Sequence, residues 1–287
     1  MTARLIDNLF AVARQYEVFL VDAWGVLHDG VSLYPGAGET LKQLIATDKK
    51  VIVLSNAARR ISAFKQELAK VGISNALYTD AVTSGDLTWQ AFNDGLLAEA
   101  GCHYYYQGPE RSRSILEGLK LTEVSDLEQA QFIINTGAEG NQSDARAFDE
   151  MLREARALNL PMVCANPDRI AIRGGVPGIS AGAIALAYEQ LGGKVIYFGK
   201  PHAPIYQFCF GLFPDKAPSA FVMLGDGLAT DIKGANKAGI DSIFLTSGIH
   251  QAELTEAEAI TQNALFEKYQ AHPTYVLHNL GNGPSGP

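Results

Sequence analysis

The segment FVMLGDGLATDIKGANKAGI, residues 221–240, joins an apolar run to a loop that carries two aspartates. The run Phe221–Leu224 predicts a buried strand, and a helix is expected to follow it as far as Ala238. Asp226 and Asp231 lie at the junction between the two. In α/β proteins, ligands bind beyond the carboxyl ends of parallel strands, so this junction is where chemistry is expected. The segment predicts a parallel sheet with an acidic site at its carboxyl edge.

Short apolar or β-branched runs alternate with helical patterns along the rest of the chain. Helical spacing is visible where apolar residues recur at positions 61, 64, 68 and 71. Such alternation predicts βαβ units and an α/β fold whose parallel sheet is covered on both faces. The predicted strands are Glu17–Val21, Val51–Leu54, Phe132–Asn135, Met162–Ala165, Val195–Phe198, Ala220–Leu224 and Ser242–Leu245.

Composition and charge exclude several classes of protein. The chain has 287 residues, of which 47% are hydrophobic and 19% charged, as in a globular protein of one or two domains. Its net charge of −8 disfavours a broad basic face for nucleic acid or an anionic membrane. The three cysteines are far apart, which argues against a disulfide framework and fits a reducing compartment. No apolar run approaches the roughly 18 residues that cross a bilayer. We expect a cytoplasmic protein with neither a nucleic-acid nor a membrane partner.

Polar side chains follow four of the predicted strands. Three buried carboxylates in one place would be costly, because like charges raise one another's pKa, and a divalent cation relieves that cost. Oxygen ligands suit Mg²⁺, whereas a lysine and a hydroxyl suit phosphoryl oxygens. A carboxylate beside a metal can also act as a nucleophile, so the set predicts phosphoryl transfer. The residues are Asp22, then Ser55 with Asn56, then Lys200 after Gly199, and finally Asp226 with Asp231.

Each of these residues also has a structural interpretation when it is taken alone. Asp22 could cap a turn or a helix, and Ser55 with Asn56 is a common turn pair. Lys200 precedes a proline, as a solvated loop lysine often does. Asp226 could lie near a helix N-terminus, where the helix dipole favours an anion. The functional interpretation depends on finding all of them at strand ends in one chain.

In this order the motifs resemble those of the haloacid dehalogenase-like hydrolases of subclass IIA, the group of sugar-phosphate and nitrophenyl-phosphatase-like proteins. The resemblance implies a Rossmann-like three-layer core formed by residues 1–79 and 194–287. It also implies an inserted α/β cap domain, residues 80–193, that selects the substrate. The matching motifs are VDAWGVLHDG (21–30), LSNAARR (54–60), GKPH (199–202), GDGLATDIKGANKAGI (225–240) and, in the cap, CANPDR (164–169).

The resemblance also implies a role for each site residue, with Mg²⁺ as the cofactor and a small phosphorylated metabolite as the substrate. A homodimer through the cap is a further expectation. Asn166 and Asp168 are the cap residues expected to face the substrate, although an Asx turn ended by Pro167 would explain them equally well. By this resemblance, Asp22 would be the nucleophile and a metal ligand, and Asp226 and the backbone carbonyl of Trp24 would be further metal ligands. Asp231 would support the metal or Lys200. Ser55 and Lys200 would bind the phosphoryl group, and Asn56 would line the phosphate pocket.

Trp24 departs from the family pattern. Phosphatases of the family carry an aspartate at this position, which protonates the leaving group and then activates water. That acid–base contribution is typically worth about 10²–10⁴ in rate, and an indole cannot exchange a proton at neutral pH. Three interpretations stay open. They are a slow phosphohydrolase that acts on leaving groups needing little protonation, such as aryl or acyl phosphates; an enzyme in which His28 or Asp29 supplies the proton; and a catalytically impaired protein that binds a phosphate ligand.

A hydrolase of the same superfamily that is not a phosphatase is a further alternative. The family's haloacid dehalogenases also carry an aromatic residue, a tyrosine, at the position of Trp24. Those enzymes need no metal, however, and have a different fourth motif. The two aspartates of GDGLATD, residues 225–231, therefore favour the metal-dependent branch.

Overall fold

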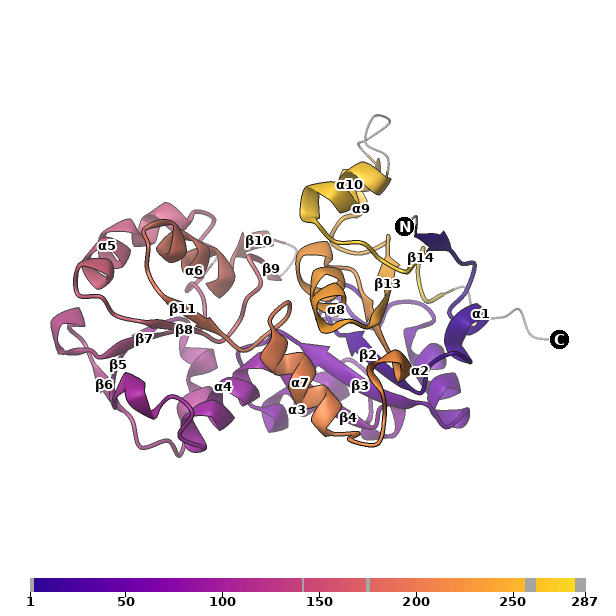
Figure 1. Ribbon diagram of the computed structural model, residues 1–287, viewed down its shortest axis with the longest axis horizontal. Helices are drawn as coiled ribbons and strands as arrows, with labels where there is room; N and C mark the ends of the chain where they lie inside the picture. The colour runs from indigo at the N-terminus through magenta and orange to yellow at the C-terminus, as the bar shows by residue number, and fades with distance from the viewer. Residues whose placement is uncertain (1–2, 141, 174–175, 256–261, 282–287) are drawn as a thin grey trace. The chain divides into compact units, whose positions relative to one another are not determined.

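The computed structural model describes residues 3–140, 142–173, 176–255 and 262–281 (Figure 1). The chain divides into two compact units. One comprises Met1–Ser55, Ser62–Val82 and Lys200–Pro287, and the other comprises Asn56–Ile61 and Thr83–Gly199. The chain therefore passes between the units directly after Ser55 and directly before Lys200, two of the predicted site residues.

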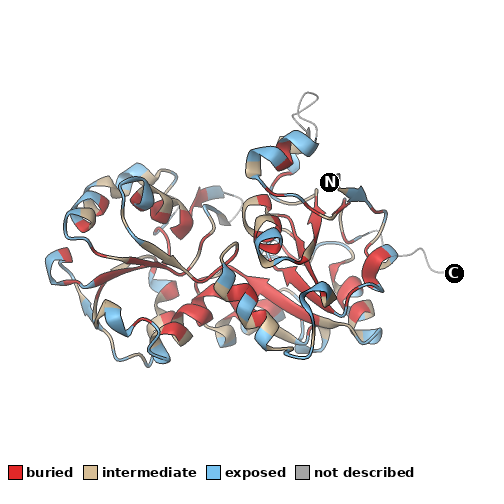
Figure 2. Cartoon of the chain, viewed as in Figure 1, coloured by how far each residue is buried: buried red, intermediate tan, exposed pale blue. Residues whose placement is uncertain are grey.

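The first unit contains a seven-stranded sheet in the order β1-β14-β13-β12-β2-β3-β4. Its central strands are continuous apolar runs that are buried on both faces, as a parallel sheet covered by helices requires (Figure 2). Parallel pairing sets Val21 opposite Leu224 and Asp22 opposite Leu54, so the carboxyl ends of β12, β2 and β3 meet at one edge. The strands are β1 (Arg4–Leu5), β2 (Val18–Asp22), β3 (Lys50–Ser55), β4 (Asp80–Thr83), β12 (Phe221–Gly225), β13 (Asp241–Leu245) and β14 (Tyr275–Leu277).

Helices and short helical turns cover this sheet. In α3 the apolar spacing seen in the sequence buries Phe64 and Leu68. The loop after β12 forms a π-helical turn, η7 (Leu228–Ile232), which continues into α8 (Lys233–Ala238) and ends at Gly239 in the left-handed conformation. The other elements are α1 (Phe10–Ala13), α2 (Ala37–Ala46), α3 (Ile61–Lys70), η1 (Asn75–Leu77), α7 (Ala203–Gly211), η6 (Pro218–Ala220), α9 (Gln251–Thr255) and α10 (Gln262–Tyr269).

The second unit has a five-stranded parallel sheet in the order β11-β8-β7-β5-β6 and a separate antiparallel pair, β9 with β10. Its core packs α5 and α6 against the sheet through residues such as Leu152 and Ile184. The strands are β5 (His103–Gln107), β6 (Thr122–Val124), β7 (Phe132–Asn135), β8 (Met162–Cys164), β9 (Ile170–Arg173), β10 (Val176–Ile179) and β11 (Val195–Tyr197). The helices and turns are α4 (Ser84–Asn93), η2 (Ala98–Ala100), η3 (Glu110–Leu116), η4 (Leu127–Gln129), η5 (Ala145–Phe148), α5 (Asp149–Ala157) and α6 (Ala181–Gln190).

The structure places two strands differently from the sequence-based division at residues 80 and 193. The sequence assigned Val195–Phe198 to the core, but β11 pairs with β8 and completes the sheet of the second unit. At the other boundary, β4 begins at Asp80 and belongs to the first sheet. The assignment of β11 to the core was wrong because an apolar, β-branched run identifies a strand but not the strand with which it pairs.

The α/β class, with a Rossmann-like parallel core, is confirmed. None of the helices in the described part of the chain has the length and apolar character needed to span a membrane.

Phe244 tests how far the core of the first unit depends on its aromatic packing. Its side chain is fully buried on β13, and its ring meets Phe266 edge-on with centroids 5.8 Å apart. We expect Phe244→Ala to lower the free energy of unfolding by about 3–5 kcal/mol, because it leaves a cavity. The measurement is urea denaturation. Leu5→Ala, which truncates an exposed side chain on β1, is the control and should change stability by less than about 0.5 kcal/mol. Equal effects of the two substitutions would contradict the packing argument.

Candidate active site

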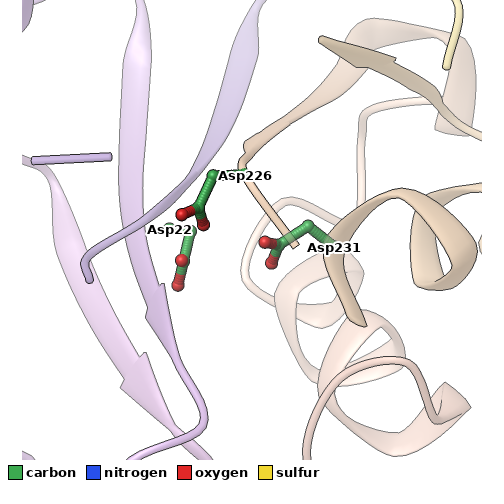
Figure 3. Close-up of side chains that lie close together, drawn as sticks. All are labelled: Asp22, Asp226 and Asp231. Carbon is green, nitrogen blue, oxygen red and sulfur yellow. The ribbon is translucent and has the colours of Figure 1, made fainter. Parts of the chain in front are cut away.

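Three aspartates lie together at the carboxyl edge of the first sheet (Figure 3). Asp22 ends β2, Asp226 follows β12, and Asp231 lies in the turn η7. One carboxylate oxygen from each residue lies within 4.8 Å of the other two, and all three residues are buried. The structure thus brings together three residues that the sequence singled out from two strand ends.

Lys200 lies against two of these carboxylates and is itself buried. Its Nζ donates a hydrogen bond to Asp22 Oδ1 at 2.6 Å and a second one to the backbone oxygen of Leu54 at 3.2 Å. The same Nζ lies 2.7 Å from Asp231 Oδ1, where the contact is an ion pair without hydrogen-bond geometry. One ammonium therefore contacts two of the three carboxylates, and the ionised cluster has an excess of negative charge.

The pKa values of two of the aspartates reflect this excess. Burial raises the pKa of Asp22 well above its ordinary value, and the charge of Asp231 adds to the effect while Lys200 opposes it. Burial and the charge of Asp231 also raise the pKa of Asp226, to about 7. A cation bound among the carboxylates would favour their ionised forms. A cluster of carboxylate oxygens suits a hard divalent ion, so the residues present fit Mg²⁺.

Glycines allow the backbone to approach Asp226 closely from two sides. A Cβ on Gly25, whose φ is +83°, would lie 1.9 Å from Asp226 Oδ2, and a Cβ on Gly248 would lie 2.1 Å from the same atom. The backbone N–H of Ile249 also donates to Asp226 Oδ2 at 2.8 Å. Side chains at either glycine would displace the carboxylate, so both positions help to fix its orientation.

His250 holds the loop that carries Asp226 and Asp231. Its Nε2 accepts a hydrogen bond from the backbone N–H of Leu228 at 3.2 Å, and its Nδ1 lies 2.6 Å from Glu253 Oε1. An imidazole that accepts a hydrogen bond at Nε2 carries its hydrogen on Nδ1. From there it donates a hydrogen bond to Glu253. No sequence pattern singles out His250, because neither its spacing nor its neighbours connect it with a loop more than 20 residues away.

Glu253 is in turn held by two residues of α10. It accepts hydrogen bonds from Lys268 Nζ at 2.6 Å and from the Tyr269 hydroxyl at 3.1 Å. Partial burial favours the neutral acid, but the hydrogen bonds from Lys268 and His250 outweigh it and lower the pKa of Glu253 to about 2. The carboxylate that orients His250 is therefore ionised at neutral pH.

Ser55 and Asn56 are adjacent in sequence but belong to different units. Ser55 ends β3 and is buried beside Leu54, which pairs with Asp22. The side-chain amide of Asn56 donates to Asp168 Oδ1 at 2.8 Å, within the second unit. The prediction that Asn56 lines the phosphate pocket is not tested by this contact, which gives its amide a structural partner.

The two cap residues expected to face substrate form a local turn. Asn166 Oδ1 accepts a hydrogen bond from the backbone N–H of Asp168 at 2.9 Å, which is the Asx turn that the sequence left open as an alternative. Asp168 is also the partner of Asn56. Substrate contact by these residues stays a prediction.

Trp24 lies at the start of the segment that follows Asp22, and 44% of its surface is exposed. Its ring packs on the imidazole of His28, with centroids 5.4 Å apart, and a Cβ on Gly30 would lie 2.3 Å from Trp24 Cη2. The indole therefore rests on its own loop on one side.

His28 and Asp29, the two proton donors considered from sequence, shape this same loop. His28 Nδ1 accepts the backbone N–H of Gly30 at 2.9 Å, and burial lowers the pKa of His28. Asp29 Oδ1 accepts the backbone N–H groups of Val31 and Ser32, and these bonds lower the pKa of Asp29. Asp29 is thus an ionised turn residue rather than an acid at neutral pH.

Comparisons with known protein families agree with this fold. The model of the haloacid dehalogenase-like hydrolases matches residues 19–122, and a second model, described as HAD-hydrolase-like, matches residues 197–282. A solved haloacid dehalogenase-like hydrolase from Brucella suis has a TM-score of 0.83 and 29% identity, covering 96% of this chain and 99% of that one.

The curated relatives of the chain include several phosphatases. D-glycerol 3-phosphate phosphatase of Mycobacterium tuberculosis is 24% identical over 94% of this chain and 71% of its own length. A glycerol phosphate phosphatase from the same organism, solved in complex with magnesium, shares the fold with a TM-score of 0.69 at 22% identity, covering 94% of this chain and 78% of that one. Other relatives, at 25% and 26% identity, are also named as phosphatases. The chain therefore has the fold of the haloacid dehalogenase-like hydrolases and is similar in sequence to phosphatases over most of its length.

Proposed function

We propose that the protein is a Mg²⁺-dependent phosphohydrolase that acts on a small phosphorylated metabolite through an aspartyl phosphate on Asp22. The observation that carries this proposal is the buried cluster of Asp22, Asp226 and Asp231 around one lysine. Asp22, Asp226, Asp231 and the backbone carbonyl of Trp24 would hold the metal. Bound Mg²⁺ would neutralise the carboxylates and the charge on the phosphoryl oxygens.

The first step is attack on phosphorus by Asp22. Because Lys200 donates a hydrogen bond to Oδ1 of this carboxylate, Oδ2 is the oxygen expected to attack. Lys200, whose Nζ bonds to the backbone oxygen of Leu54, and the hydroxyl of the adjacent Ser55 would hold the phosphoryl group. As the bond from Asp22 to phosphorus forms, the bond to the leaving oxygen breaks. Water then attacks the phosphorus, releases inorganic phosphate and restores the carboxylate.

Proton transfer limits both steps. Trp24 occupies the position from which the family's aspartate protonates the leaving group, and an indole cannot replace it. The hydrogen bonds that His28 and Asp29 accept from backbone N–H groups support a role in shaping the loop rather than in proton transfer. We infer that leaving groups that depart as stable anions react faster, and that hydrolysis of the aspartyl phosphate, which lacks a base to activate water, is slow.

Hydrolysis of 4-nitrophenyl phosphate tests the reaction directly. With Mg²⁺ we expect a burst of about one equivalent of 4-nitrophenolate per site, because formation of the aspartyl phosphate outpaces its hydrolysis. A chelator or Asp22→Asn should abolish both the burst and the turnover. Mg²⁺ should also raise the melting temperature of the wild-type protein, and Asp226→Asn should reduce that shift. Binding of inorganic phosphate without any burst or turnover would instead identify a phosphate-binding protein.

Trp24→Asp tests whether the missing acid limits the rate. The new carboxyl could protonate the leaving group and then activate water, so we expect turnover of glycerol phosphate to rise by roughly 10²-fold. The rate of the 4-nitrophenolate burst should rise less, because that leaving group needs little protonation. Trp24→Asn is the matched control, since it has nearly the same shape but cannot transfer a proton. Equal rates for the Asp and Asn variants would refute the explanation.

His250→Ala tests whether the imidazole positions the metal-binding loop. Loss of the Leu228 hydrogen bond should raise the Mg²⁺ concentration needed for half-maximal activity by about 10-fold or more. His250→Gln, whose side-chain oxygen can accept the same hydrogen bond, should recover most of the Mg²⁺ affinity. His272→Ala, at an exposed histidine, is the control. A fall in melting temperature with an unchanged Mg²⁺ requirement would show that His250 serves stability alone.

A further inference from the structure

The places where the chain enters and leaves the second unit lie together inside that unit. The chain enters it at Asn56, re-enters it at Thr83 and leaves it for the last time after Gly199. A Cβ on Gly199 would lie 2.5 Å from Asn56 Oδ1 and 2.8 Å from Ser84 Cβ. Because contacts that short leave no room for a side chain, only glycine lets these three segments pack so closely.

The turn after β8 completes this packing. The side-chain amide of Asn56 donates a hydrogen bond to Asp168 Oδ1 at 2.8 Å, and a Cβ on Gly199 would lie 2.5 Å from Pro167 Cδ. The turn is itself held by α6, because the N–H of Gly182 donates to the backbone oxygen of Asp168 at 2.9 Å. The junction clamp, as we call this cluster, consists of Asn56, Ser84, Pro167, Asp168 and Gly199.

The first turn of α4 holds the segment that begins at Asn56. Ser84 Oγ donates to the backbone oxygen of Asn56 at 3.1 Å, and both residues are buried. The N–H of Gly85 donates to the backbone oxygen of Ala57 at 3.1 Å, and a Cβ on Gly85 would lie 2.2 Å from the backbone nitrogen of Arg59. The segment is therefore held both by α4 and by the bond from Asn56 to the turn after β8.

The junction clamp is bonded directly to two residues of the candidate site. Ser55 precedes Asn56, and Lys200 follows Gly199. Lys200 Nζ donates to Asp22 Oδ1 at 2.6 Å, so a displacement of the lysine backbone would disturb the ammonium that contacts the nucleophile. A displacement at Asn56 passes to Ser55 through one peptide bond. Misplacement of a group in an active site by about 1 Å can cost roughly 10²-fold in rate.

We propose that Asp168 is a positioning residue for the phosphoryl-binding groups, an inference that rests on the proposed function. By holding Asn56 in the junction clamp, it fixes the backbone from which Ser55 and Lys200 extend. Asp168 thus acts on the part that all substrates share, the phosphoryl group, and not on the leaving group. This task differs from the substrate contact that the family resemblance implies for Asp168.

Two substrates with unlike leaving groups separate positioning from substrate contact. 4-Nitrophenyl phosphate has an aromatic leaving group, and acetyl phosphate has a small acyl one. We expect Asp168→Ala to lower kcat/KM for both by the same factor, about 10- to 100-fold, because both lose the same phosphoryl contacts. Since kcat/KM covers the steps up to formation of the aspartyl phosphate, slow hydrolysis of that intermediate does not mask the effect.

Inorganic phosphate gives a readout that involves no leaving group. As a competitive inhibitor it should bind the Asp168→Ala variant about 10-fold more weakly than the wild type, because Ser55 and Lys200 are less well placed. A residue that only stabilises the fold would lower the melting temperature without changing this inhibition constant.

Matched variants make the test specific to the hydrogen bond. Asp168→Asn keeps an oxygen that can accept from Asn56, so kcat/KM and the inhibition constant should stay within about threefold of wild type. Asn56→Ala should reproduce the loss seen in Asp168→Ala. The double variant should lose no more than either single variant, because both substitutions remove the same bond. Glu150→Ala, which removes an exposed carboxylate on α5, is the control.

Gly199→Ala disturbs the junction clamp from its other side. The new Cβ would lie 2.5 Å from atoms of Asn56 and Pro167, so we expect a common loss of kcat/KM for the two substrates here too. Gly211→Ala adds a methyl group where no described neighbour lies within 4 Å, and it should leave both values unchanged. Equal values for the Gly199 and Gly211 variants would contradict the role of the clamp.

The outcomes distinguish this inference from the proposed function. If the wild-type protein with Mg²⁺ reacts with neither substrate, the phosphohydrolase proposal fails and this inference fails with it. If the wild type reacts but Asp168→Ala affects the two substrates by factors that differ more than about 10-fold, Asp168 contacts the leaving group and the positioning role is overturned. An unchanged inhibition constant for phosphate, or a loss that Asp168→Asn does not restore, would also overturn it while the phosphohydrolase proposal stands.

Discussion

The burial of three carboxylates around a single ammonium is the constraint on which the rest of the site depends. Burial, together with repulsion among carboxylates whose oxygens lie within 4.8 Å of one another, raises the pKa of Asp22 and Asp226. Such an arrangement persists only if the surrounding backbone holds it, because like charges repel one another and lose their hydration when they are buried. Gly25 and Gly248 enclose Asp226, and His250 ties down Leu228 between Asp226 and Asp231. The fold rather than the carboxylates themselves thus holds the cluster together, as the proposed cation site requires.

The sequence predicted the members of this cluster because parallel sheets obey a simple geometric rule. The strands of such a sheet end at the same edge, so residues that follow β2, β3 and β12 are expected along one edge. Asp22 meets Asp226 because β12 and β2 are neighbours in the sheet, an order that the pattern of apolar runs does not reveal. Lys200 was also predicted to lie at this edge, but for a wrong reason. The strand before it, β11, belongs to the sheet of the second unit, and Lys200 is the residue at which the chain re-enters the first unit.

The residues that sequence reasoning missed or could not assign are those whose partners lie far away along the chain. The bond from Leu228 to His250 and the bond from Asn56 to Asp168 each join loops that share no local pattern. Asn56 shows the limit most clearly. Its neighbour Ser55 belongs to the first unit, whereas the Asn56 amide bonds to the Asx turn of the second unit. Adjacency in sequence suggested that both residues line one phosphate pocket. The bond from Asn56 to Asp168 does not require such a pocket.

Trp24 shows how one substitution changes what the neighbouring residues can do. With an aspartate at this position, His28 and Asp29 would only need to shape the loop, and the observed hydrogen bonds to Gly30, Val31 and Ser32 serve that purpose. With tryptophan there, His28 would have to give up the hydrogen bond that its Nδ1 accepts from Gly30 before it could act as an imidazolium acid. Under the proposed function, the barrier to leaving-group departure would then be set by the stability of the departing anion rather than by proton transfer from the protein. Selectivity among leaving groups would follow from the absence of a proton donor at Trp24.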